Sequence, residues 1–157
     1  MPTPKKLPAQ LPTFLTFFAF TLLFTGCNTV TDDQPGQPVM HRQQAFKEIL
    51  KVFEPMGTML RTNNYQAEKF LALANELKAR RDAPWAHFGP HTNYPPTKAA
   101  AAIWQRPGEF EQDRQAFLAA TDELVSVAQH KDAATIEPVY KKLYDTCRTC
   151  HKTFRAG

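Results

Sequence analysis

The five residues from Cys147 to His151 read Cys-Arg-Thr-Cys-His and combine two thiols with an imidazole. This C-x-x-C-H pattern is the attachment signature of c-type haem, in which each thiol adds to a vinyl group of the porphyrin and the histidine binds the iron. On a helix, positions 147, 150 and 151 lie on one face, so the three side chains can reach a single macrocycle. The motif therefore predicts one covalently bound haem c, held by Cys147 and Cys150, with His151 as an axial ligand of the iron.

Three other kinds of site use closely spaced cysteines. A thioredoxin-like redox pair requires a βαβ setting, and the sequence shows no strand-like alternation. A zinc site needs four ligands at characteristic spacings, whereas the other histidines are scattered (His41, His87, His91 and His130). A disulfide between Cys147 and Cys150 would leave the adjacent histidine without a role. The leader sequence favours haem, because c-type haem is attached outside the cytoplasm.

The first 26 residues have the composition of an export signal. Lys5 and Lys6 precede a largely apolar run from Phe14 to Phe24. As a helix these eleven residues rise about 16 Å, roughly half the thickness of a bilayer core. The run is too short to span a membrane and predicts a signal peptide.

Cys27 follows this signal directly after two small residues, Thr25 and Gly26. The arrangement resembles the lipobox of bacterial lipoproteins, whose cysteine is diacylated and becomes the mature N-terminus, although Phe24 stands where those proteins usually have leucine. By the same resemblance, Asn28 in place of aspartate implies the outer membrane of a Gram-negative bacterium. We therefore expect a periplasmic protein anchored to the membrane by lipid at Cys27. Ordinary signal cleavage that leaves a free Cys27 is the alternative.

The net charge of the chain becomes small once the leader is removed. The sequence has 19 Lys and Arg against 15 Asp and Glu, and residues 1–26 contain two of the lysines and no acid, which leaves a net charge of +2. No cluster of basic residues with interleaved aromatics remains, so we expect no nucleic-acid partner. A length of 157 residues, 43% of them hydrophobic, suits one globular domain and is too short for a two-domain enzyme.

Four segments have apolar residues at helical spacing: 39–60, 64–81, 107–128 and 135–154. Pro55 is expected to kink or end the regular part of the first, and Thr135 to cap the last. A proline-rich connection, 82–106, is longer than most helix–helix connections, which indicates a functional or ordered excursion. These segments predict an all-α fold, an antiparallel four-helix bundle with its haem near the C-terminus. The expected organisation is a signal peptide at 1–26, a tether at 27–38 and a haem domain at 39–157.

Residues 39–157 resemble the cytochrome c′ family of class II c-type cytochromes. The resemblance rests on Arg42-Gln43 in the first helix, PWAHFGP at 84–90, Ile103-Trp104 and the C-terminal CRTCHKTFR. A haem motif so close to the C-terminus, followed by Phe154-Arg155, is distinctive, because most small c-type cytochromes carry it near the N-terminus. The family has the four-helix bundle fold, so the resemblance implies the same fold here.

The resemblance also implies roles for individual residues. Cys147 and Cys150 would hold the haem, His151 would be the proximal iron ligand, and Arg155 would lie one turn beyond it on the proximal side. Further haem contacts are implied beside the propionates for Arg42 and Gln43, and in the long connection for Thr97 and Lys98. A solvated helix residue is the alternative for Arg42. The family often forms homodimers through its first two helices, which makes a second copy of this chain an expected partner.

Phe46 occupies the position that faces the sixth coordination site in this family. Phenylalanine cannot bind iron, so the resemblance implies a five-coordinate, high-spin haem with an apolar distal pocket that Trp85 and Phe88 help to form. Such a pocket admits small neutral gases, nitric oxide above all and carbon monoxide. Plain core packing is the alternative for Phe46.

Two functions follow from this resemblance: binding of small diatomic gases and transport of single electrons in the periplasm, where the sequence identifies no redox partner. The alternative is a low-spin Met/His electron carrier without a gas-binding role, for which three methionines are available (Met40, Met56 and Met59). An enzyme is not expected, because a peroxidase would need an acid–base residue near Phe46.

Overall fold

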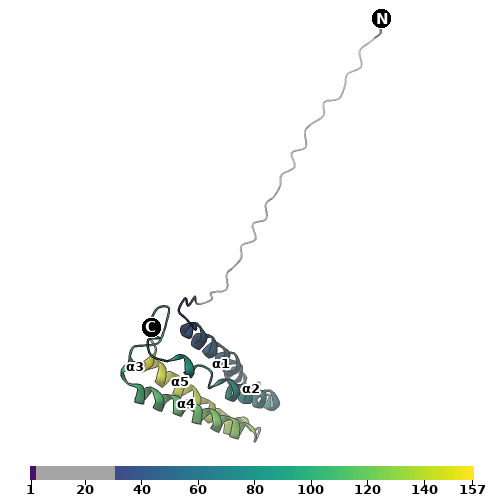
Figure 1. Cartoon of the computed structure of the whole chain (residues 1–157). Coiled ribbons are helices and arrows are strands. Elements are labelled where there is room, and N and C mark those ends of the chain that lie inside the picture. Colours follow the sequence, from purple (N-terminus) through teal and green to yellow (C-terminus); the bar gives the residue numbers. More distant parts are fainter. Residues whose placement is uncertain (3–30) are drawn as a thin grey trace.

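The computed structural model describes residues 1–2 and 31–157, and four long helices make up most of the described chain (Figure 1). They are α1 (Pro38–Arg61), α2 (Ala67–Arg80), α4 (Pro107–Ala128) and α5 (Ala133–Phe154). Between α2 and α4 lie a 3₁₀ turn, η1 (Trp85–His87), and a short helix, α3 (Ala102–Gln105). The predicted signal peptide and Cys27 fall outside the described residues, apart from Met1 and Pro2.

The long helices pack in sequence order around one core, α1 on α2, α2 on α4, α4 on α5 and α5 on α1 (Figure 1). Each long helix buries the stripe of apolar side chains that its sequence spacing predicts. Buried side chains of these stripes include Phe53, Phe70, Leu77, Leu124 and Leu143. Among residues 31–157 there is no strand, and only an isolated bridge joins Ala99 to Arg155. The predicted all-α four-helix bundle is confirmed. No helix of the described part has both the length and the apolarity to cross a membrane.

Two details of the helix ends differ from the sequence prediction. Thr135 does not cap α5, because the helix begins two residues earlier and the Asp132 carboxylate accepts hydrogen bonds from the Ala134 and Thr135 amides at 3.3 and 3.2 Å. Pro55 does not end α1, which continues to Arg61. The proline removes only one amide donor, and packing of the apolar face of α1 on both sides of it sustains the helix.

Asp32, within the segment expected to be a tether, is buried against the bundle, with 2% of its surface exposed. Gln37, at the N-cap of α1, offers no side-chain hydrogen bond to the helix. The Asp32 carboxylate instead accepts from the amides of Val39 at 2.8 Å and Met40 at 3.2 Å, and from the Tyr94 hydroxyl at 3.0 Å. Burial alone would raise the pKa of Asp32, but these hydrogen bonds outweigh it and lower the pKa. Asp32 therefore caps α1 and ties it to the long connection.

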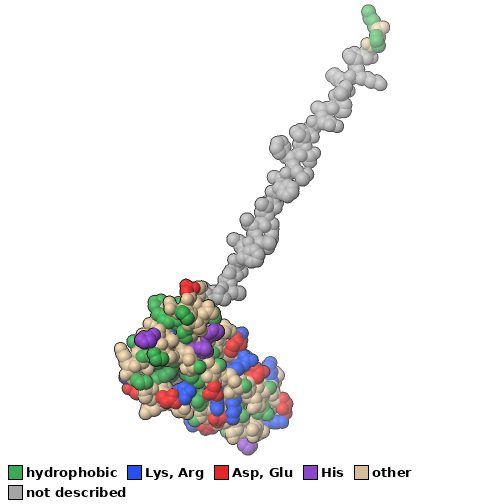
Figure 2. All heavy atoms as spheres, in the orientation of Figure 1, with side chains coloured by type: hydrophobic (Ala, Val, Ile, Leu, Met, Phe, Trp, Pro, Cys, Tyr) green, Lys and Arg blue, Asp and Glu red, His purple; other side chains and the backbone are tan. Residues whose placement is uncertain are grey.

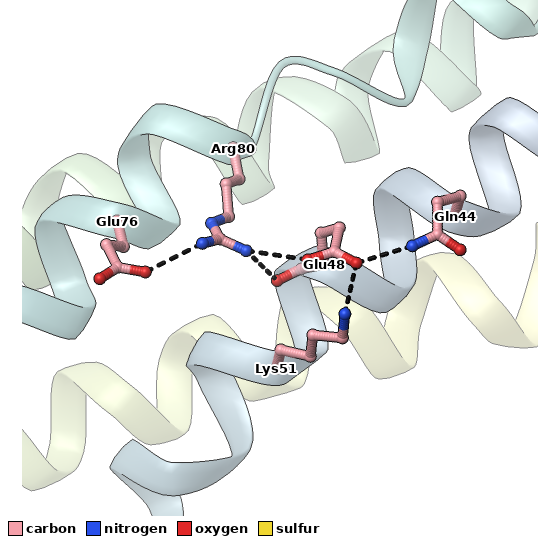
Figure 3. Close-up of polar contacts among 5 residues, drawn as sticks. All are labelled: Gln44, Glu48, Lys51, Glu76 and Arg80. Atoms are coloured by element: carbon pink, nitrogen blue, oxygen red, sulfur yellow. Dashed lines mark hydrogen bonds and ion pairs between the residues drawn. The ribbon is translucent and has the colours of Figure 1, made fainter.

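An exposed polar network joins α1 to α2 (Figure 3). Glu48 accepts hydrogen bonds from Gln44, Lys51 and Arg80, and Arg80 also reaches Glu76 at 3.0 Å. Because these groups are solvent-exposed to a large degree, each pair contributes about 0–1 kcal/mol. The network sets the register of the two helices more than it stabilises them.

Gly57 lies where α1 packs tightly against Tyr140 of α5. A Cβ atom at this position would overlap the Tyr140 hydroxyl and lie 2.9 Å from the Tyr140 Cζ. Tyr140 cannot move easily, since its hydroxyl donates to the Phe53 carbonyl at 3.2 Å and its ring stacks on Phe53. We predict that Gly57→Ala lowers the free energy of unfolding by about 1–3 kcal/mol through overpacking.

Gly108→Ala is the matched control for this prediction. It also lies in a helix, and a Cβ there would meet no atom within 4 Å. We expect Gly108→Ala to be neutral or slightly stabilising, by up to about 1 kcal/mol. Urea unfolding of the haem-loaded proteins measures both changes, and equal midpoints for the two variants would contradict the close packing of Gly57 on Tyr140.

Candidate haem site

The C-x-x-C-H motif lies on the last turns of α5, which stays helical from Ala133 to Phe154. Cys147 and Cys150 are half-buried free thiols, and Cys147 packs against the core. His151 follows on the same helical face and is open to solvent. The predicted convergence of two thiols and one imidazole on one face of the last helix is therefore present.

The thiols are in an environment that keeps them protonated. Burial raises the pKa of Cys147, and burial together with the charge of Asp113 raises the pKa of Cys150 to about 12. A redox-active cysteine pair instead requires a lowered thiol pKa, because the thiolate is the nucleophile. The neutral thiols argue against disulfide exchange, and their number and spacing fit thioether attachment of a haem.

His151 is suited to act as a metal ligand. Surrounding protein and the nearby charge of Arg155 lower its pKa, so the imidazole is neutral at pH 7 and keeps a lone pair for a metal. Arg155 follows four residues after His151, directly past the end of α5. Among the described residues, no three His, Cys, Asp or Glu side chains group as a metal site of their own. On α5 His151 is the imidazole that could bind an iron, and a porphyrin would supply further ligands.

The register between α1 and α5 determines what faces His151. Phe53 of α1 stacks on Tyr140, at 4.6 Å between ring centroids, and on Tyr144, at 6.5 Å. The two helices run in opposite directions, so a step toward the start of α1 corresponds to a step toward the end of α5. Phe46 lies two turns before Phe53 on α1, and His151 lies two turns after Tyr144 on α5. This register brings Phe46 level with His151.

Phe46 belongs to a group of aromatic side chains from α1, η1 and α4. Its ring centroid lies 5.6 Å from that of Trp85 and 6.4 Å from that of Phe88. Phe110 and Phe117 extend the group, at 6.1 and 6.0 Å from Trp85. The structure therefore brings together Phe46, Trp85 and Phe88. Sequence reasoning did not connect Phe110 and Phe117 with this group, because apolar spacing along one helix does not show which aromatic side chains of different elements meet.

Both tryptophan N–H groups in this region are already occupied. Trp85 Nε1 donates to the Arg81 carbonyl at 2.7 Å. Trp104 Nε1 donates to the carbonyls of Phe88 and Gly89 at 3.2 and 3.0 Å. Neither indole has a hydrogen bond left for a ligand beside Phe46.

Arg42 is buried, with 3% of its surface exposed, and holds the long connection to α1. Its guanidinium donates to the carbonyls of His87 and Thr92, both at 2.8 Å, and to the Thr97 hydroxyl. It also lies 5.0 Å from the centroid of the Phe88 ring. The alternative of a solvated residue is wrong for Arg42. Among the described residues no carboxylate pairs with this buried cation, so the propionates of a haem would suit it as counter-ions.

The other predicted haem contacts, Gln43 in α1 and Thr97 and Lys98 in the long connection, are placed less directly. Gln43 is half-buried, and its Nε2 donates to the Pro96 carbonyl at 3.2 Å. Thr97 accepts from Arg42 and from the Ala99 amide. Lys98 is exposed, and its ammonium donates to the Gly157 carbonyl at 3.0 Å. Lys98 therefore ties the connection to the C-terminus, and the structure gives it no contact with the aromatic group.

Replacing Arg42 is predicted to loosen the connection that covers this end of the bundle. Arg42→Ala removes three hydrogen bonds and leaves the carbonyls of His87 and Thr92 without a donor, so we expect the free energy of unfolding to fall by about 2–4 kcal/mol. Arg42→Lys should recover only part of this, because an ammonium cannot reproduce the planar fork of donors.

The control is Arg106→Ala, which removes an exposed ion pair with Glu109 and should change the free energy of unfolding by less than about 1 kcal/mol. Denaturant titration of the haem-loaded proteins measures each value. If Arg42→Ala and Arg106→Ala unfold at the same denaturant concentration, the three hydrogen bonds contribute nothing to stability.

A four-helix bundle that presents C-x-x-C-H on its last helix, next to an apolar aromatic group, defines a bundle-type c-type cytochrome. Residues 37–155 match the model of the family described as Cytochrome C′. The chain belongs to the cytochrome c′ family. Members of this family bind a covalent haem c, and Cys147 and Cys150 form the site for it here.

Individual relatives agree with this assignment. Cytochrome c′ of Alcaligenes xylosoxydans xylosoxydans is 29% identical over 126 residues, which cover 78% of this chain and 95% of that protein. The solved cytochrome c prime of Shewanella frigidimarina has a TM-score of 0.75 at 26% identity, covering 81% of this chain and all of the other. A nitric oxide complex of a variant from Alcaligenes xylosoxidans has a TM-score of 0.74 at 26% identity, with the same coverage.

Proposed function

We propose that this protein binds small neutral diatomic gases, nitric oxide above all and carbon monoxide, at the distal side of its haem in the periplasm. Electron transport is a second role compatible with the same site. The observation that carries the proposal is the position of Phe46, level with His151 and surrounded by aromatic side chains. Solved relatives from Alcaligenes xylosoxidans with nitric oxide and with carbon monoxide support the choice of ligand.

Each part of the site would then have a defined task. When bound, the haem supplies an iron that binds a gas molecule and changes oxidation state by one electron. Cys147 and Cys150 would hold the haem covalently, His151 would donate its imidazole lone pair to the iron, and Arg42 would supply a buried positive charge for the propionates. Phe46 would limit access to the iron to small molecules.

The chemistry of the pocket would select among small ligands. Phe46, Trp85 and Phe88 present apolar surface, and the Trp85 N–H is already donated to the Arg81 carbonyl. An anion would lose its hydration there without gaining a partner, and bound oxygen would find no donor. The same lack of an acid–base group beside Phe46 is why we propose a binding protein and not an enzyme.

The low-spin alternative needs a methionine close to the iron. Met56 and Met59 are buried in the core, on either side of Gly57. Gly57 lies against Tyr140, which is eleven residues before His151, or about 16 Å along α5. This separation favours a five-coordinate iron over ligation by Met56 or Met59.

An absorption spectrum of the reduced, haem-loaded protein, recorded with and without nitric oxide, tests the proposal. We expect a high-spin five-coordinate spectrum that changes when the gas is added. A low-spin six-coordinate spectrum that nitric oxide leaves unchanged would overturn gas binding and establish the electron carrier with a second protein ligand.

We further propose that the protein is anchored by lipid at Cys27 to the periplasmic side of the outer membrane of a Gram-negative bacterium. The Thr25-Gly26-Cys27 sequence after an export signal is the support for this location. Labelled palmitate should enter the wild-type chain in cells and should not enter the Cys27→Ser variant. Absence of label from the wild type would remove the anchor.

A further inference from the structure

We infer that the end of the bundle that carries the haem motif faces the lipid surface, with the connection between η1 and α3 lying against the bilayer. This inference rests on the proposed lipid anchor at Cys27. It comes from three observations: the docking of Asp32, the elements gathered at this end and the charge of the surface there.

The docking of Asp32 shortens the tether. Because its carboxylate is bound by the amides of Val39 and Met40 and by the Tyr94 hydroxyl, the chain is held to the domain at residue 32. Five residue steps separate Cys27 from Asp32, and even a fully extended chain covers at most about 18 Å in five steps. The lipidated cysteine therefore stays close to Tyr94.

The bundle is longer than this tether. α4 and α5 each have 22 residues, which corresponds to about 33 Å. The turn between them, which contains His130, lies at the opposite end of the bundle from the start of α1 (Figure 1), where Asp32 binds the helix. With Asp32 held within about 18 Å of the lipidated residue, the domain cannot turn over to rest on the His130 end.

The elements near Asp32 are those that surround the haem motif. Tyr94 belongs to the long connection, which Arg42 holds to α1. The same connection pairs with the end of α5, since the Ala100 amide donates to the Phe154 carbonyl at 2.9 Å and the Ala156 amide to the Lys98 carbonyl at 2.8 Å. The end nearest the membrane is therefore the end that carries Cys147 to His151.

The surface at this end is suited to contact with lipid. Residues 83–97 contain no Lys, Arg, Asp or Glu, and the exposed side chains among them include Pro90, His91, Asn93, Pro95 and Pro96. Figure 2 shows mostly apolar, histidine and uncharged side chains at the end of the bundle where α1 begins, with more of the charged side chains over the other half. Asp33 and Lys98 flank this uncharged surface.

Approach to a bilayer costs least where few charges lose hydration, and apolar and aromatic groups are favoured at the interface. The uncharged connection meets this condition better than the charged sides of α2, α4 and α5. The partner of this surface is thus the headgroup region of the membrane that holds the anchor. Gas binding at this end would take place next to the lipid phase.

Two exposed histidines at opposite ends of the bundle test the orientation. His91 lies in the uncharged connection and His130 in the turn between α4 and α5. The haem-loaded, lipidated protein is incorporated into vesicles of phosphatidylethanolamine and phosphatidylglycerol and treated with diethyl pyrocarbonate, and modification at each histidine is followed by mass spectrometry. We expect modification of His91 to be several-fold slower than in the Cys27→Ser protein added to the same vesicles, and modification of His130 to be unchanged.

A second variant separates the orientation from other effects of the anchor. A Gly/Ser insert of about 20 residues between Val30 and Thr31 adds more than 20 Å of average reach and should restore the rate at His91. If the wild type floats with the vesicles and His91 still reacts at the rate of the Cys27→Ser protein, the orientation is wrong while the anchor stands. A wild type that carries no lipid and does not float overturns the anchor and the orientation together.

Discussion

His151→Ala is expected to lower the yield of haem-loaded protein by at least about tenfold, because the chain offers the iron no other imidazole on this face of α5. His151 follows Cys150 directly on α5, and burial and the charge of Arg155 keep its pKa below the ordinary value. The measurement is the ratio of haem absorbance to protein in material purified from the periplasm. The remaining haem should show an altered spectrum, since its proximal ligand is lost.

Rescue by a small molecule distinguishes ligation from a structural role. Imidazole added to His151→Ala should restore the spectrum of the wild type, because it fits the space that the side chain leaves. His130→Ala is the matched control: the residue is exposed, lies in the turn before α5 and should leave haem content unchanged. If the His151→Ala variant has the same haem content and the same spectrum as the wild type, another residue binds the iron.

Phe46→Ala is expected to raise the association rate of carbon monoxide by about tenfold or more, equivalent to a barrier about 1.4 kcal/mol lower. The reason is steric: Phe46 packs edge-on against Trp85, and by the register of α1 on α5 its ring would fill part of the space through which a ligand reaches the iron. Flash photolysis of the reduced carbon monoxide complex measures the rate. Phe46→Leu should give a smaller increase, because leucine fills part of the same space.

Phe53→Ala serves as the control for loss of volume. Phe53 lies two turns further along α1, stacks on Tyr140 and is more deeply buried than Phe46. Its removal should cost about 3–5 kcal/mol of stability through a cavity in the core, with the carbon monoxide rate unchanged. Equal rates for the wild type and Phe46→Ala would place Phe46 away from the iron, and equal acceleration by both variants would indicate general loosening of the bundle.

Helix boundaries show where local sequence is sufficient and where it is not. Apolar periodicity located all four long helices to within a few residues, because each helix buries one stripe of its own side chains. It missed the start of α5, since Thr135 and Asp132 both qualify as caps and the choice depends on the geometry of the preceding turn. The Asp32 cap of α1 has no sequence signal, because it acts from outside the usual capping position.

The sequence by itself determined the chemistry of attachment. Two thiols and an imidazole at positions 147, 150 and 151 share a helical face wherever that helix packs, because helix geometry depends on local hydrogen bonds. The bundle class followed from the same local periodicity. Tertiary structure alone decided that Arg42 is buried under the long connection and that Asp32 binds Tyr94. It also set the register of α1 on α5 that brings Phe46, which the family resemblance gave as the distal residue, to the height of His151. The hydrogen bonds of Arg42 and the one between Asp32 and Tyr94 join residues between 45 and 62 positions apart, and they depend on how helices and loops pack against one another, which side-chain spacing along one segment does not specify.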